Sequence, residues 1–513
     1  MWAGQDYHAL RTLCLQKGQL FEDPVFPQDL SDPKIEWKRP TEFCSNPKFI
    51  ESGSSSTDVC QGELGDCWLL STLSALTVHP SLFSRVVPAD QSFSRSEGHS
   101  GIFHFNLWQF GEWMNVVIDD KLPTKNGQLM FTKSDSREEL WSALLEKAYA
   151  KYVHPCTPHN GGMGWNTLLP TAGSLPLTSS CVVVSGGYSA LQGGTVAEAL
   201  EDFTGGIAES VSLSRYTSEE VWEMVTEAES KKSLMACFIQ VSDPTDVGRV
   251  DEDGLVLGHA YSVLGAKEVT LGSGKVTLIR LRNPWGFTEY TGPWSDKSLE
   301  WKSVSDVEQK ALNLQKEDGE FWMLCEDFCS LFSWVVICAS NMESPQYKLT
   351  ELRGRWERGV SAGGGRRLKS FFTNPQFRFR VGVASEVVSD SESGTEERWT
   401  MLLELLQTDR RATKLHIACH LNRPVSDTGD PQNSRGVTMK ASLSPGEYVI
   451  VPSTYDANQE GNFYIRVYCE KATDNRYVTC SDESKVEKPL VTTWSIMEAA
   501  DYLLVVGLGH GGS

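Results

Sequence analysis

The stretch Gln61-Gly-Glu-Leu-Gly-Asp-Cys67-Trp68, followed by the apolar segment 69–76, decides the fold of the first part of this chain. Its glycines predict a turn, and the apolar segment predicts a buried helix that begins at the cysteine. A helix N-terminus carries about half a positive charge, which favours the thiolate form of a cysteine placed there. Gln61 can offer a side-chain N–H to a developing oxyanion. The stretch therefore predicts a nucleophilic cysteine with an oxyanion donor beside it.

The composition limits the class of protein around this motif. The chain has 513 residues, which is too long for one core and suggests about three domains. Its formal net charge of −20 opposes the basic surface that nucleic-acid binding requires. The 13 cysteines include no CxxC pair, so neither a zinc ribbon nor a disulfide framework is indicated. The N-terminus lacks a signal-peptide pattern, and no long apolar run is present. We therefore expect a cytoplasmic protein.

The residue patterns change along the chain. Helical spacing over 5–18 predicts a short amphipathic helix, and a second one is predicted over 137–152. A further helical pattern ends at Gly205-Gly206, a plausible hinge between two lobes. Short β-rich runs then dominate. After about residue 340 their spacing predicts an antiparallel sandwich, interrupted by an acidic loop over 386–397.

A nucleophilic thiolate needs a base, and the base needs an orienting partner. Of the ten histidines, His259 is the best placed, because glycine precedes it and a β-rich run follows it. Asn283, in the turn 281–286, is placed to hold the tautomer of that histidine. A lone cysteine at a helix start, a lone strand histidine or a lone Asn-Pro turn is usually structural. The complete set, in the order Cys67, His259, Asn283, is typical of papain-type cysteine proteases.

These motifs resemble those of the calpain family, calcium-dependent cysteine proteases of papain-like fold. The resemblance extends from about residue 5 to 471, apart from 152–184. The matching segments are 20–24, 57–70, 141–151, 201–206, 258–263, 282–286 and 317–323, followed by 356–364, 371–377 and 446–454. The resemblance implies an α+β fold class: a two-lobed papain-like protease core followed by an antiparallel, C2-like β-sandwich.

The implied domain boundaries follow the family pattern. They are an N-terminal anchor helix over 1–20, the cysteine lobe over 21–206, the histidine and asparagine lobe over 207–340, the C2-like sandwich over 341–485 and an unmatched tail over 486–513.

The resemblance also implies the role of individual residues. Cys67 would be the nucleophile, His259 the general base and acid, and Asn283 the orienter. Gln61 would form the oxyanion hole with the Cys67 N–H. Trp285 would lie beside the cleft and change position when calcium draws the lobes together; the alternative is a core tryptophan.

Two calcium ions in the protease core are implied as cofactors, and hard oxygen ligands of this kind suit calcium. The first site would use the backbone carbonyls of Glu51 and Gly53 with the carboxylates of Asp58 and Glu139. The second would use Glu289, Asp296, Asp318 and Glu320, with a backbone carbonyl near Lys316. Without the family, any one of these acidic residues would be expected to be simply solvated.

The expected function is calcium-regulated endoproteolysis of cytosolic proteins, with extended protein segments as substrates and weak phospholipid contact through the C2-like domain. No nucleic-acid partner is expected. We find no EF-hand loop motif, so a small-subunit dimer formed through EF-hands is not expected. The main alternative is a catalytically impaired, calpain-like scaffold or binding protein. A pure phospholipid-binding module is disfavoured, because it would give the complete catalytic set no purpose.

One segment does not fit the family. Residues 152–184 form an insert of different composition inside the first lobe, which is either a genuine surface loop or a retained intron. His154, Cys156 and His159 superficially resemble metal ligands, but three candidates separated by prolines make a poor zinc site. If the insert disturbs the lobe, activity would be lost although every catalytic residue is present.

Overall fold

The computed structural model of the chain describes residues 5–26, 30, 32–51, 53–153, 187–271, 274–312, 318–339, 347–381, 398–408, 415–421, 428, 432–470 and 479–481. The chain divides into two compact units, 1–340 and 341–513, and each is described by itself. Lys316, the acidic loop 386–397, the tail 486–513 and nearly all of the insert 152–184 lie outside the described residues.

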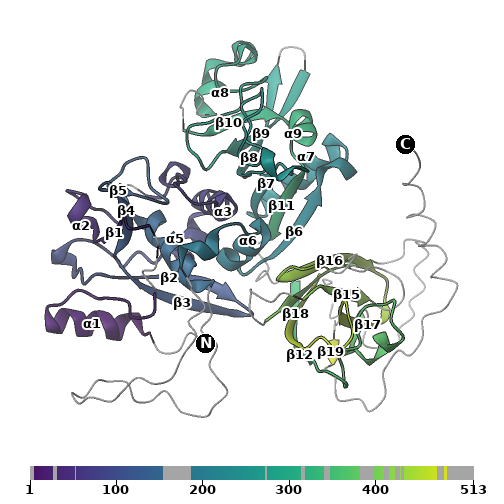
Figure 1. Cartoon of the computed structure of the whole chain (residues 1–513). Coiled ribbons are helices and arrows are strands. Elements are labelled where there is room, and N and C mark those ends of the chain that lie inside the picture. Colours follow the sequence, from purple (N-terminus) through teal and green to yellow (C-terminus); the bar gives the residue numbers. More distant parts are fainter. Residues whose placement is uncertain are drawn as a thin grey trace, which may run out of the picture. The chain divides into compact units, whose positions relative to one another are not determined.

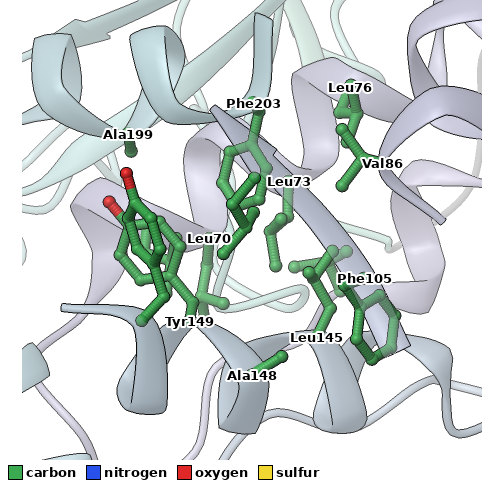
Figure 2. Packing of buried hydrophobic residues seen from close by; sticks show 14 of the residues in the cluster. Leu70, Leu73, Leu76, Val86, Phe105, Leu145, Ala148, Tyr149, Ala199 and Phe203 are labelled. Carbon is green, nitrogen blue, oxygen red and sulfur yellow. The ribbon is translucent and has the colours of Figure 1, made fainter. Parts of the chain in front are cut away.

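The first part of unit 1 is built around one buried helix, α3 (Cys67–Thr77), as the opening motif predicted. Ten of its eleven residues are buried, because apolar and small side chains occur on all of its faces. Figure 2 shows Leu70 and Leu73 of α3 meeting Tyr149, Leu145 and Phe203 from neighbouring elements. The other helices and strands of this part are α1 (Tyr7–Lys17), β1 (Ile35–Lys38), α2 (Pro40–Phe43), α4 (Pro80–Val86), β2 (Ile102–Gln109), β3 (Glu112–Asp119), β4 (Leu122–Lys125), β5 (Gln128–Leu129), α5 (Trp141–Tyr152) and α6 (Val196–Thr204).

Buried lysines of α5 fasten the surrounding chain to this helical core. Lys151 donates to Asp23 Oδ2 at 2.5 Å and to the carbonyl of Val117 at 2.6 Å. Lys147 donates to Asp119 Oδ1 at 2.5 Å. Breaking such a pair would leave a buried charge without its partner, which is strongly destabilising. The α5 lysines therefore fix the N-terminal arm and strand β3 on the first lobe.

The second part of unit 1 is a six-stranded antiparallel sheet with the order β10-β9-β8-β7-β11-β6 (Figure 1). It begins directly after α6, which ends at Gly205 in the left-handed conformation (φ 70°). One face of the sheet packs on α3, through β7 and β8. Its elements are β6 (Ile207–Ser212), α7 (Ser218–Ser230), β7 (Leu234–Phe238), β8 (Ala260–Leu271), β9 (Gly274–Arg282), α8 (Asp306–Ala311), β10 (Glu320–Leu324), α9 (Cys325–Leu331) and β11 (Trp334–Ala339).

Unit 2 is an antiparallel β-sandwich of two four-stranded sheets, with the orders β12-β18-β14-β16 and β15-β17-β13-β19. Alternating side chains of both sheets form one apolar core. Its strands are β12 (Tyr347–Trp356), β13 (Phe377–Val381), β14 (Trp399–Gln407), β15 (Ile417–Leu421), β16 (Gly436–Leu443), β17 (Gly446–Thr454), β18 (Gly461–Glu470) and β19 (Thr479–Ser481). The predicted fold class is confirmed: a mixed helix and sheet core is followed by an antiparallel sandwich. No helix in the described part of the chain has the length and apolarity to span a membrane.

Candidate active site

Cys67 is the first residue of α3, and close packing of the preceding loop places it there. A Cβ on Gly62 would lie 2.4 Å from the carbonyl oxygens of Met130 and Phe131, so only glycine fits. After the cysteine, Trp68 donates its indole N–H to the carbonyl of Leu191 at 3.0 Å. The loop and the helix start are therefore held from both sides, which fixes the position of the thiol.

His259 and Asn283 lie at the ends of the adjacent strands β8 and β9. Their side chains meet directly, with 2.8 Å between His259 Nε2 and Asn283 Oδ1, and both residues are buried. Asn283 is itself fixed, because its Nδ2 donates to the carbonyl of Thr288 and its Oδ1 accepts the Trp285 N–H. Because Nε2 is hydrogen-bonded to Asn283, Nδ1 is the ring nitrogen that can accept the proton of a thiol. This is the geometry that a general base with an orienting amide requires.

The two lobes meet around the thiol through several direct bonds. The backbone N–H of Ala260, next to His259, lies close enough to the Cys67 thiol to lower its pKa. The backbone N–H of Gln61 donates to the Pro284 carbonyl at 2.8 Å. The Ser262 hydroxyl donates to the Ser71 carbonyl on α3 at 2.7 Å. The structure thus brings the helix that begins at the nucleophile candidate together with the strand that follows the base candidate.

Arg282, the last residue of β9, is a functional residue that the sequence did not single out. Its guanidinium is fully buried and donates to the Val59 carbonyl at 2.7 Å and to Ser74 Oγ at 3.1 Å. Both acceptors belong to the first lobe, one just before Gln61 and one on α3. The only sequence signal was its place directly before Asn283. Arg282 ties the strand that ends at the orienter to the helix that carries the nucleophile.

The electrostatic state of the site differs from the expected thiolate. Burial raises the pKa of the Cys67 thiol, and the neighbouring Asp66 charge raises it further, although the Ala260 N–H opposes this. Burial also lowers the pKa of His259 to about 4, despite its bond to Asn283. At neutral pH the structure therefore contains a thiol beside a neutral imidazole. At Cys67, desolvation changes the thiol pKa more than the positive charge at the helix N-terminus does.

This state predicts how Cys67 reacts with iodoacetamide when calcium is chelated. Because only the thiolate reacts and the thiol pKa is raised, we expect alkylation at pH 7 to be at least about threefold slower than for a free cysteine. The rate should climb through pH 9. Mass spectrometry of the Cys67 peptide over pH 6–10 measures it, with Cys67→Ser for background. A constant rate between pH 6 and 8 would indicate a preformed thiolate–imidazolium pair and contradict the prediction.

Gln61, the oxyanion donor candidate, lies in the loop before Cys67. Its Nε2 donates to the carbonyl of Leu64 at 2.5 Å and to Asp66 Oδ1 at 3.3 Å. Its Oε1 is buried and has no partner among the described residues. The amide plane is therefore set by the loop itself.

Trp285 packs on the catalytic histidine candidate. Its ring centroid lies 5.1 Å from that of His259, and it also stacks on Phe287, with 6.1 Å between the ring centroids. Phe287 is 72% exposed. Trp285 therefore lies between the imidazole and the outer rim of the site, and its predicted movement with calcium stays a prediction.

The first candidate calcium site contains two buried carboxyl groups that contact each other, Asp58 and Glu139. Glu139 Oε1 also accepts the backbone N–H of Glu51 at 2.7 Å. Burial, together with the charge of Asp58, raises the pKa of Glu139 to about 8. Adjacent carboxylates without a cation repel each other, and the set is rich in hard oxygen donors. These residues, with Gly53 nearby in the same loop, fit calcium.

The residues of the second candidate site are only partly gathered. Burial raises the pKa of Glu289 to about 7, and the charges of Asp296 and Asp318 add to the effect. Glu320 instead pairs with Arg280 and accepts the hydroxyl of Ser56. In the part of the chain that the structure describes, no three His, Cys, Asp or Glu side chains converge as a metal site. The oxygen donors fit calcium, but Glu320 would have to leave Arg280.

Comparison with known proteins agrees with this architecture. Residues 16–183 and 174–339 match the model of the calpain family cysteine protease, and 352–422 and 415–468 match calpain large subunit, domain III. The calpain-1 catalytic subunit of Mus musculus is 40% identical over 519 residues, covering 92% of this chain and 67% of that protein. The calpain-2 catalytic subunit of Bos taurus is 39% identical over 537 residues, covering 95% and 71%. Calpain-8 of Mus musculus is 40% identical over 519 residues, covering 92% and 68%. The chain belongs to the calpain family of cysteine proteases.

Proposed function

We propose that the chain is a calcium-regulated cysteine endopeptidase that performs limited proteolysis of cytosolic proteins. The observation that carries the proposal is the His259–Asn283 hydrogen bond beside the N-terminus of α3, where Cys67 lies. A thiol, an oriented imidazole and a nearby side-chain amide are the groups that acyl transfer from a peptide requires.

In the proposed reaction His259 takes the proton of Cys67, and the thiolate attacks the peptide carbonyl. The oxyanion accepts N–H groups from the Cys67 backbone and the Gln61 side chain. The tetrahedral intermediate collapses as the imidazolium gives its proton to the leaving amine. Water, deprotonated by His259, then attacks the thioester, and the second collapse releases the acid product and the thiol. Asn283 keeps the imidazole oriented throughout.

Calcium enters the proposal through the two carboxyl clusters. Asp58 and Glu139, with the carbonyls of Glu51 and Gly53, would hold one ion. The second set would be Glu289, Asp296, Asp318 and Glu320 with a carbonyl near Lys316. When bound, calcium supplies positive charge that neutralises the repulsion within each cluster. Ser56, near Asp58, donates to Glu320 of the other lobe, which supports the proposal that the two clusters act on the contact between the lobes.

The test is cleavage of casein by the purified chain with millimolar calcium and with chelator. We expect calcium to raise the rate by at least about tenfold, a usual size for coupling between sites. Cys67→Ser should show no cleavage. Glu139→Gln should raise the calcium concentration for half-maximal activity, because it removes one anionic ligand. The matched control is Glu138→Gln, which alters only partly exposed contacts with Lys48 and Asn46.

The outcomes separate the alternatives. Cleavage that requires Cys67 but not calcium would support the proposed peptidase activity and contradict its regulation by calcium. No difference between the wild type and Cys67→Ser would favour the catalytically impaired scaffold.

A further inference from the structure

Two buried carboxyl groups next to the nucleophile have no role in the reaction described above. Asp66 directly precedes Cys67 and is 0% exposed, and Glu146 of α5 is 1% exposed. Asp66 occupies the N-cap of α3, where aspartate normally accepts a helix N–H. Its side chain makes no such bond, and the N–H groups of Leu69 and Leu70 bond to its backbone carbonyl instead. The Asp66 carboxyl group is therefore directed away from the N–H groups of the helix.

The Asp66 side chain links the oxyanion donor candidate to α5. Asp66 Oδ1 accepts from Gln61 Nε2 at 3.3 Å, and the same buried carboxyl group lies beside the carboxyl group of Glu146, which acts on its pKa. Glu146 is anchored in turn by Thr132, whose hydroxyl donates to Oε1 at 2.7 Å and whose N–H donates to Oε2 at 3.2 Å. A continuous chain of side-chain contacts therefore runs from Thr132 to Gln61.

Two ionised carboxylates cannot hydrogen-bond to each other, because neither has a donor. No lysine or arginine in the described part of the chain pairs with Asp66 or Glu146. The adjacent Lys147 is bound to Asp119 and to the Lys121 carbonyl. The other titratable groups that face the pair, Cys67 and Tyr188, carry no positive charge; burial raises the pKa of each, and the Asp66 charge adds to the effect.

A single proton on one of the two carboxyl groups allows them to hydrogen-bond. Asp66 Oδ2 is buried and lacks a partner among the described residues, but a protonated Glu146 would donate to it. Burial and the Asp66 charge raise the pKa of Glu146 well above its usual value, and burial raises that of Asp66 to about 7. The proton therefore belongs to Glu146, because its two Thr132 bonds do not offset the burial and the adjacent charge.

We propose that Asp66 and Glu146 are a positioning pair, in which neutral Glu146 donates to Asp66 and the Asp66 carboxylate holds the Gln61 amide for oxyanion binding. The inference rests on the proposed peptidase function. Of the two bonds made by Gln61 Nε2, the 3.3 Å bond to Asp66 is the weaker, so this N–H is the one that the oxyanion shares. Neutral Glu146 also keeps a second negative charge away from the thiolate.

The kinetic test compares two replacements of Glu146. In Glu146→Gln the amide donates permanently to Asp66 and its oxygen still accepts from Thr132, so we expect kcat within about threefold of the wild type. Glu146→Leu removes the donor, and we expect kcat to fall about 10- to 100-fold with KM unchanged, because the oxyanion forms only in the transition state. Gln61→Ala should cost as much or more, and adding Glu146→Leu to it should cost little further.

A second measurement does not depend on catalysis or on the folding of the leucine variant. The infrared spectrum at neutral pH should contain the carbonyl stretch of a protonated carboxylic acid that disappears in Glu146→Gln. With 15N-labelled glutamine, the Gln61 side-chain amide protons should exchange slowly in the wild type and in Glu146→Gln, and faster in Asp66→Ala. If the wild type does not cleave peptides, the proposed function fails while these spectra still decide the pair. A glutamine variant as impaired as the leucine variant, no lost acid band, or unchanged Gln61 exchange in Asp66→Ala would overturn the proposal.

Discussion

Cys67→Ala should abolish peptide-bond cleavage, with a loss of at least about 10³-fold in kcat at saturating calcium. The physical reason is that alanine removes the thiol at the start of α3, close to the Ala260 N–H that follows His259. Without the thiolate no thioester intermediate can form, and direct attack of water on the peptide carbonyl is much slower. Initial rates on a fluorogenic peptide measure the loss, and the folded state is checked by circular dichroism.

A matched control is available seven residues earlier. Cys60 is also a half-buried thiol at the lobe interface, with its Sγ 3.8 Å from Arg282 Nη2 and 3.5 Å from the Thr57 carbonyl. It precedes the turn and does not lie on α3. We expect Cys60→Ala to keep kcat within about threefold, because weak sulfur contacts of this length contribute little. Equal losses in both variants would show that the interface, and not the nucleophile, is being measured.

The parts of the site that could be predicted from the sequence are those with local causes. The glycine turn and apolar run around Cys67 predicted the helix start, and α3 begins there. The glycine before His259 and the β-rich run after it predicted a strand edge, and β8 begins at the next residue. In the sandwich, the β-rich spacing predicted after about residue 340 corresponds to antiparallel strands such as β13, β17 and β18. Periodicity and turn residues carry this information within a few positions.

What could not be predicted depends on contacts between distant segments. No local pattern reveals that β11 lies between β6 and β7, or that Ser262 bonds to Ser71. The protonation states were missed for the same reason. Charge at a helix N-terminus is a local property, whereas the burial that raises the pKa of Cys67 is a property of the folded structure. Asp66 is part of the opening motif, but its contact with Glu146 depends on α5 packing beside the start of α3. The sequence pattern does not reveal that packing.

Arg282→Met should have the second largest effect, on stability and activity together. The change keeps much of the side-chain volume but removes the donors to Val59 and Ser74, and leaves the Val59 carbonyl unsatisfied. Buried hydrogen bonds to a charged group contribute about 1.5–3 kcal/mol each, so we expect the loss of two to lower the free energy of unfolding of unit 1 by about 3–6 kcal/mol. Urea titration followed by tryptophan fluorescence and by residual activity measures it.

The same variant should lower kcat by about 100-fold in the molecules that remain folded. Asn283 follows Arg282 directly, so a small shift of the end of β9 moves the orienter and His259 away from α3, and misplacement by about 1 Å can cost this much. Lys275→Met on the same strand is the control, because it breaks only an exposed pair with Glu268, worth about 1 kcal/mol or less. A stable Arg282→Met protein with unchanged kcat would mean that the lobes are aligned without this arginine. A destabilised protein with unchanged kcat would make Arg282 a stability residue only, since the catalytic geometry would then survive the loss of the bond that joins β9 to α3.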